Sequence, residues 1–122
     1  MNEFPYLNHF TEKEFICKCG CGYADFDHYF LKKLDRAREL AGISFILNSA
    51  CRCRKHNKEV GGVENSSHIF GCAVDIKCDN SFARIKIVYG LITAGFKRII
   101  VHQTFIHADT DPRKQNIFDI DW

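Results

Sequence analysis

The stretch KRIIVHQTFIHAD, residues 97–109, constrains the fold of this chain more than any other. It holds two short apolar runs of the kind that form β-strands, with a turn expected near Gln103. Parallel neighbours need a crossover of about a dozen residues or more, so these two strands must pair antiparallel. Because helical and strand patterns are interspersed elsewhere, the sequence predicts an α+β fold with a small antiparallel sheet packed against two main helices.

Two amphipathic segments supply the main helices of this prediction. In DFDHYFLKKLDRARELAG, apolar side chains recur at three- and four-residue spacings, Asp25 can act as the N-cap and Gly42 follows the end. In SFARIKIVYGLITAG, Ser81 is the expected cap and Gly95 lies just past the end. Both helices should therefore bury one apolar face against the sheet or against each other.

Shorter elements fill the remaining chain. Thr11 and Glu14 form a capping box that predicts a short helix, and RKHNKEVGG predicts another. Residues 43–48 and 72–77 are strand candidates because they are apolar and rich in β-branched or aromatic side chains. The segment after residue 110 begins as a turn and ends in a short strand or a packed tail.

The length and composition indicate one globular domain, over residues 1–122. The net charge of +2 comes without a long Lys/Arg block, which gives no support to nucleic-acid binding. No run approaches the roughly 18 apolar residues of a membrane helix. The N-terminus lacks a basic start followed by an apolar run, so we expect no secretory signal peptide and synthesis in the cytoplasm. We also expect a monomer.

The chain has seven cysteines, and an odd number cannot pair completely within one chain. Without a signal peptide, we expect reduced thiols in a cytosol-like compartment. Cys17, Cys19 and Cys21 alternate, so they could face one way in an extended segment and bind a metal. They form no Cys-x-x-Cys knuckle and have no assigned fourth ligand, so the expected cofactor is one catalytic ion only.

Three polar residues stand out because of their positions. Asp75 and His107 each lie between two apolar neighbours in a predicted strand. Since side chains alternate across a strand, both should point away from the core, and two paired strands would put them on one surface. A turn around Gly71 would then fold His68 back over Asp75.

Two imidazoles and one carboxylate make a three-ligand zinc set. Such a set leaves the fourth position for water, which is the mark of a catalytic site. Zinc can lower the pKa of that water toward about 7, giving a nucleophile near neutral pH. The alternative is an aspartate that caps a turn beside two unrelated histidines.

A family resemblance follows from these residues. SSHIFGCAVDI matches the pattern Ser-x-His-x-x-Gly-x-Ala-x-Asp, with NSACRCRKHNKEVGG upstream and FIHAD downstream. This order resembles the zinc D-alanyl-D-alanine carboxypeptidases of peptidase family M15, which share a fold with the hedgehog signalling domain. FTEKEFICKCGCG also resembles the start of the small phage-associated members. The resemblance spans about residues 10–109 and implies a hedgehog/DD-peptidase-like fold.

The resemblance implies roles for five residues. His68, Asp75 and His107 correspond to the zinc ligands of the family. Arg52 corresponds to the arginine that holds the substrate near the scissile bond, a role that suits a permanently charged fork of donors. Ser66 corresponds to a serine that helps to orient the substrate. The alternatives are a solvated loop cation for Arg52 and a loop cap for Ser66.

The general base is the point where this sequence departs from part of the family. One branch has a glutamate where this chain has Thr104, which cannot act as a base. Another branch has a histidine at the position of His102, and an imidazole can move protons near neutral pH. The alternative is a turn histidine. Asp109, two residues beyond His107, could orient a ligand, receive a substrate amine or simply end the strand.

The resemblance therefore implies a zinc metallopeptidase that cleaves peptidoglycan stem peptides. The bond could be D-Ala–D-Ala, as in a carboxypeptidase, or L-Ala–D-Glu or a cross-bridge, as in an endolysin. The expected lack of a signal peptide suits a phage or prophage enzyme released to the cell wall by a holin. Thr104 keeps open a second hypothesis, a non-catalytic zinc-containing module that binds a peptide or wall fragment. Such a module would not need His102.

Overall fold

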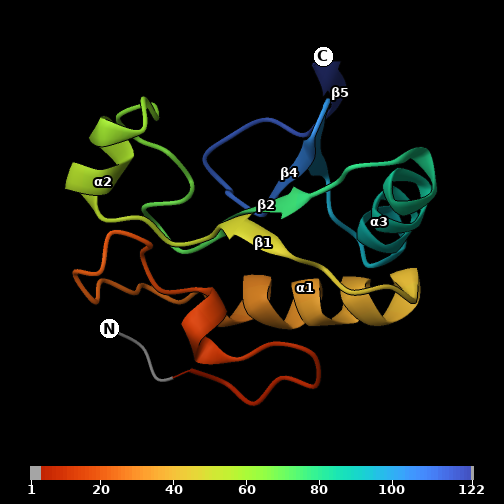
Figure 1. The fold of residues 1–122 in the computed structure, drawn as a ribbon, viewed down its shortest axis with the longest axis horizontal. Helices are drawn as coiled ribbons and strands as arrows, with labels where there is room; N and C mark the ends of the chain where they lie inside the picture. The colour runs from red at the N-terminus through yellow and green to blue at the C-terminus, as the bar shows by residue number, and fades with distance from the viewer. Residues whose placement is uncertain (1–3, 122) are drawn as a thin grey trace.

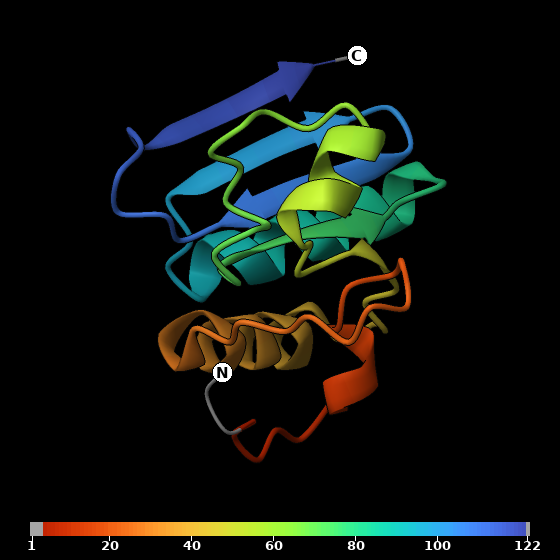
Figure 2. The same cartoon turned by 90° about the vertical axis from the view of Figure 1, so that its left-hand side faces the viewer.

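The computed structural model describes residues 4–121 and confirms the α+β class. A sheet separates α3 on one face from α2 and its loops on the other, and α1 lies beneath the β1 edge and packs against α3 (Figures 1 and 2). The elements in chain order are η1 (Glu12–Glu14), α1 (His28–Ala41), β1 (Leu47–Ser49), α2 (Arg54–Glu59), β2 (Ala73–Lys77), α3 (Ser81–Thr93), β3 (Arg98–His102), β4 (Phe105–Asp109) and β5 (Ile117–Asp121).

The sheet has the strand order β1-β2-β4-β3-β5. The predicted hairpin is confirmed, since β3 and β4 pair antiparallel, as do β1 with β2 and β2 with β4. The sheet is mixed rather than antiparallel throughout, because the C-terminal strand β5 pairs parallel to β3. The reason lies in the path of the chain: β4 runs back to the start of β3, and the following loop delivers β5 to that same end on the free side of β3.

The two main helices form where the apolar periodicity predicted them, but each begins at a different cap. Asp27 rather than Asp25 caps α1, since its carboxylate accepts the backbone N–H of Phe30 at 3.2 Å. Asn80 rather than Ser81 caps α3. In both helices the cap is the last residue with extended backbone. Several neighbouring polar residues have side chains that can also cap a helix, so the sequence alone does not choose between them.

The strand predicted at residues 43–48 is shorter and later in the structure. β1 occupies only Leu47–Ser49, at the edge of the sheet beside β2. β2 ends at Lys77, whose backbone N–H donates to the carbonyl of Ile46. Residues 43–45 therefore lie beyond the end of β2 and do not pair with it. The predicted short helices η1 and α2 are confirmed, and the N–H of Thr11 donates to the Glu14 carboxylate at 2.7 Å.

The core lies between the sheet and the helix pair. Val74, Ile76, Ile106 and Ala108 of β2 and β4 are fully buried on the face that α3 covers. α1 and α3 approach closely at Gly90, where a Cβ would overlap the backbone of α1. Within residues 4–121, none of the helices is both long and apolar enough to cross a bilayer.

Candidate metal centre

The pairing of β2 with β4 places Asp75 directly opposite His107. Their flanking residues are buried on the other face of the sheet, as the alternation of polar and apolar residues predicted. The Asp75 Oδ1 lies 3.0 Å from the His107 Nδ1. The sheet register alone therefore brings together a carboxylate and an imidazole that are 32 residues apart in sequence.

His68 reaches the same point through the turn at Gly71. Gly71 has a φ of 69°, in the left-handed region that favours glycine, and a Cβ there would overlap the carbonyl oxygen of Asp25. The turn leaves His68 only 3% exposed, with its Nε2 at 3.4 Å from the Asp75 Oδ1. Ligand atoms of His68, Asp75 and His107 all lie within 4.8 Å of one another.

The second nitrogen of each histidine ring is held by the protein. The His68 Nδ1 lies 2.7 Å from the carbonyl oxygen of Ala50, which can only accept, so Nδ1 carries the proton and Nε2 offers its lone pair. The His107 Nε2 lies 2.7 Å from the Asp109 Oδ2, which leaves Nδ1 as the nitrogen that can bind a metal. When His107 gives up its second proton, the lone pairs of both rings are therefore directed toward Asp75, which is how protein partners orient metal-binding histidines.

The spacing and chemistry of the three groups fit zinc. Zinc bonds to nitrogen and oxygen are about 2.1 Å long, so two ligands of a tetrahedral ion lie roughly 3.4 Å apart. The separations of 3.0 and 3.4 Å from the Asp75 Oδ1 to the two rings are close to this value. Imidazole and carboxylate are also ordinary zinc ligands, and three of them leave one position open.

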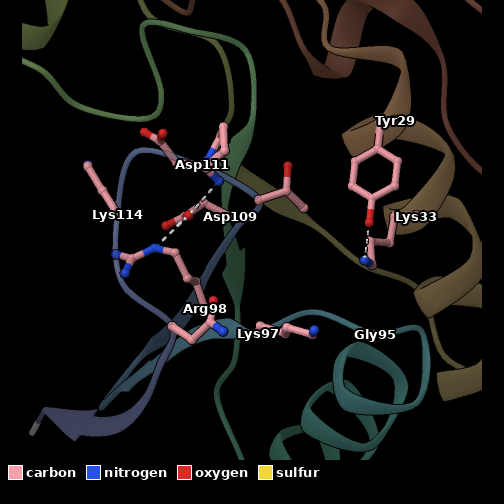
Figure 3. A pocket seen from close by; sticks show the side chains of 11 residues that line it. Tyr29, Lys33, Gly95, Lys97, Arg98, Asp109, Asp111 and Lys114 are labelled. Carbon is pink, nitrogen blue, oxygen red and sulfur yellow. Dashed lines mark hydrogen bonds and ion pairs between the residues drawn. The ribbon is translucent and has the colours of Figure 1, made fainter.

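Asp109 supports the site from behind. It is 1% exposed, and its Oδ1 accepts from the Arg98 Nε at 2.8 Å and from the backbone N–H of Asp111 at 3.0 Å (Figure 3). With its Oδ2 engaged by His107, neither oxygen is available to a substrate amine. Its position instead fits the other role considered above, the orientation of a metal ligand.

The electrostatics of the group favour a charged pair before a metal binds. Burial alone would raise the pKa of the Asp75 carboxyl, but the interactions with His107 and His68 outweigh burial and hold this pKa well below its usual range. Burial would likewise lower the pKa of His107, but Asp109 and Asp75 raise it to about 9. A metal must therefore displace a proton from His107.

Arg52 lies beside this group at the edge of a cavity of about 300 Å³ that Ser49 and Asp75 also line. Its backbone N–H donates to the carbonyl of His68 at 3.0 Å, so the two residues are fixed to each other. Burial lowers the pKa of its guanidinium, and Asp75 opposes this shift. The buried Nε has no hydrogen-bond partner within the described part of the chain, which leaves a donor free for a ligand.

Ser66 is buried in the loop that carries His68. Its hydroxyl accepts the backbone N–H of His68 at 3.2 Å, so the contact that the structure shows is with the loop itself. This is the loop-capping alternative, in which Ser66 helps to shape the turn. Ser66 is not among the residues that line the cavity with Arg52.

His102 lies at the end of β3, on the same face of the sheet as His107. Ile100 is directly opposite His107, and His102 is two residues further along the strand. The ring of His102 stacks on Phe105 with centroids 4.2 Å apart, and its Nδ1 is 3.8 Å from the Asp121 Oδ2. His102 thus contacts Phe105 and Asp121 and is not a member of the His68–Asp75–His107 group. Thr104 lies in the hairpin turn, where its carbonyl accepts from Cys78.

Arg98 is a supporting residue of the site that was not predicted from the sequence. This residue pairs directly opposite Asp109 across the hairpin and donates to it at 2.8 Å. The signal was present, because a hairpin that turns between residues 102 and 105 sets residues 98 and 109 opposite each other. A cation facing a buried carboxylate at that register would have indicated the supporting role of Asp109.

Comparison with known proteins agrees with this geometry. A family model described as Peptidase M15 matches residues 8–109, a range that contains all three members of the metal group and Arg52. A search of curated proteins gave no match. Since the match to the family model covers most of the chain, this protein belongs to peptidase family M15, a family of metallopeptidases that typically depend on zinc.

Proposed function

We propose that this protein is a zinc metallopeptidase that hydrolyses peptide bonds in peptidoglycan stem peptides. The observation that carries the proposal is the convergence of His68, Asp75 and His107, with both histidine rings oriented by protein partners. Membership of the peptidase family supports the reaction type. The cell-wall substrate rests on the resemblance of the Ser66–Asp75 motif to D-alanyl-D-alanine carboxypeptidases.

The three ligands would hold the ion at the edge of the cavity that Arg52 lines. When bound, zinc would act as a Lewis acid and lower the pKa of a coordinated water toward about 7. The carboxylate of Asp75 would supply negative charge to the cation, and Asp109 would keep His107 in the tautomer that binds it.

Arg52 is the candidate for binding the substrate. Arg52 lines the same cavity as Asp75, its Nε has no hydrogen-bond partner among the described residues, and a guanidinium can form two parallel hydrogen bonds with a carboxylate. A substrate that ends in a free carboxylate, such as D-Ala–D-Ala, could accept both of these parallel hydrogen bonds. An internal peptide bond would offer only a carbonyl oxygen, which is why we favour the carboxypeptidase reaction over the endopeptidase reaction.

His102 is our candidate for moving the proton to the leaving amine. Its ring is partly exposed on the face of the sheet that carries the ligands, and its nearest acid, Asp121, is 3.8 Å away. Hydrogen bonds of catalytic bases are often long before substrate binds, so this geometry is compatible with the role. Asp121 would stabilise the imidazolium while the proton is held.

The test is mass spectrometry of products from a defined muropeptide that ends in D-Ala–D-Ala. We expect loss of one terminal alanine, inhibition by a chelator and recovery on adding zinc. Cleavage inside the stem would identify an endopeptidase instead. His9→Ala is a suitable control because His9 is exposed and its backbone N–H donates to the carboxylate of Asp35 in α1, away from the metal group.

A protein that binds zinc but cleaves no wall peptide would support the second hypothesis, a non-catalytic module that binds a peptide or wall fragment. The two are separated by titrating the muropeptide into protein whose zinc content is known. Binding without turnover in several wall types and at several pH values would reject the peptidase proposal.

A further inference from the structure

We propose that Cys17, Cys19, Cys21 and Cys53 form a second metal site, in which four thiolates hold a structural zinc ion. This site is separate from the His68–Asp75–His107 group and does not depend on the proposed peptidase activity. The four sulfur atoms all lie within 4.8 Å of one another. Three of the cysteines come from the segment before α1, and the fourth comes from the loop after β1.

The sulfur separations match those around a zinc ion. Cys17 Sγ lies 3.5 Å from Cys19 Sγ and 3.8 Å from Cys53 Sγ, and Cys19 Sγ lies 3.8 Å from Cys53 Sγ. Zinc–sulfur bonds are about 2.3 Å long, so two sulfurs of a tetrahedral site lie roughly 3.8 Å apart. A disulfide needs about 2.05 Å, far shorter than any of these separations. All four cysteines are free.

Local backbone geometry folds the first three cysteines around one point. The N–H of Cys17 donates to the carbonyl of Tyr23 at 3.0 Å, which closes the segment into a loop. Within it, Gly20 and Gly22 have φ values of 87° and 81°, which other residues rarely adopt. The glycines therefore allow alternate cysteines to turn inward instead of following an extended strand.

Backbone N–H groups point at three of the sulfurs. Tyr23 donates to Cys21 Sγ at 3.4 Å, Cys53 to Cys17 Sγ at 3.3 Å, and His56 to Cys53 Sγ at 3.3 Å. Such donors stabilise negative charge on sulfur and fix the direction of its lone pairs. Four protein ligands leave no open position, which identifies a structural site rather than a catalytic one.

The site would hold Arg52 in place. Cys53 follows Arg52 directly, and the N–H of Cys51 donates to the carbonyl of Phe15 at 3.2 Å. The backbone of Arg52 is in turn bonded to His68. A metal bridging Cys53 and the 17–21 loop would therefore fix the segment that carries the guanidinium, and through it the edge of the cavity beside Asp75.

The first experiment counts zinc in protein purified under reducing conditions. We expect two equivalents in the wild type and one in Cys19→Ser, with the remaining equivalent lost in Cys19→Ser/His68→Ala. Cys78→Ala is the matched control, because Cys78 is buried outside the group and should leave both equivalents. A wild type with one equivalent that Cys19→Ser retains in full would overturn the proposal.

The second experiment identifies the ligands by replacing zinc with cobalt. We expect an intense near-ultraviolet thiolate-to-cobalt absorption band that His68→Ala retains and Cys21→Ser weakens or abolishes. Cys19 and Cys21 are exposed, so serine at either position removes no core contact and circular dichroism should stay unchanged. A cobalt-loaded wild type without this band would refute thiolate ligation. The band in His68→Ala would support the four-cysteine site even if the protein showed no peptidase activity.

Discussion

Replacing Asp109 by asparagine would test how the protein prepares His107 for a metal. The substitution keeps the size of the side chain but exchanges one acceptor oxygen for an amide donor. In the wild type, one carboxylate oxygen accepts from Arg98 and the Asp111 backbone, and the other faces the His107 Nε2 at 2.7 Å. If the asparagine oxygen keeps the first pair of donors, its NH₂ faces His107. A neutral His107 ring must then carry its proton on Nδ1, where it points at Asp75 and blocks metal binding.

Two magnitudes follow from this change. Loss of the partner that orients a metal-binding histidine typically costs roughly 10–100-fold in metal affinity, or about 1.4–2.7 kcal/mol. The second magnitude concerns protons: a His107 pKa of about 9 means that this ring is almost fully protonated in the metal-free protein at pH 7. Because the metal takes the neutral ring, His107 should release about one proton per zinc. Apparent affinity should thus rise as the pH increases from 7 and level off above 9.

The assay combines a chelator competition titration with calorimetry in two buffers of different ionisation enthalpy. A Cys19→Ser background restricts the reading to the histidine site. In Asp109→Asn the pKa of His107 falls, so we expect both the affinity and the number of protons released to decrease. Asp111→Asn is the control, since the Asp111 carboxylate is also buried but bonds Ser67 and Arg113 rather than His107. An Asp109→Asn variant with wild-type affinity and proton release would refute the reasoning.

Four further predictions concern single residues. Asp75→Ala should lose one equivalent of zinc by elemental analysis, and full retention would contradict its assignment as a ligand. His102→Ala should keep its zinc but slow muropeptide turnover by roughly 2–4 orders of magnitude; near-normal turnover would identify another proton carrier. Arg52→Lys should raise KM for a substrate ending in carboxylate with zinc content unchanged, because lysine cannot offer the planar fork; an equal KM would place Arg52 outside the substrate site. Gly71→Ala should cost about 1–3 kcal/mol in urea unfolding, because it adds a Cβ against the Asp25 carbonyl and strains a left-handed backbone; an unchanged midpoint would show that the turn relaxes freely.

The positions of Asp75 and His107 could be predicted from sequence because strand alternation has a strict period of two. One polar residue between two apolar ones can point only away from the core, and the short turn before Phe105 fixes the hairpin register. Alternation does not say which strands are neighbours, so it is the structure that identifies β2 and β4 as partners. Local sequence thus contained the direction of each side chain but not the pairing that brings the two together.

Other features depend on packing that local sequence does not report. Asp25 and Asp27 are both good helix caps, and only the backbone angles of Asp27 decide between them. Cys53 is 36 residues from Cys17, and nothing near either residue indicates that the β1 loop returns to the first cysteines. The direction of β5 likewise depends on the path of the loop after β4.

The parallel strand β5 determines which backbone groups this edge of the sheet presents. All five of its residues are exposed, including Ile117, Phe118 and Ile120, yet its backbone covers the row of N–H and C=O groups along β3. An uncovered row of that kind is a template for pairing with another molecule. The family match ends at residue 109, so β5 lies beyond the matched region. Shortening the chain before Ile117 would leave the metal ligands in place. It would also make β3 the edge strand, whose unpaired backbone N–H and C=O groups can pair with another molecule.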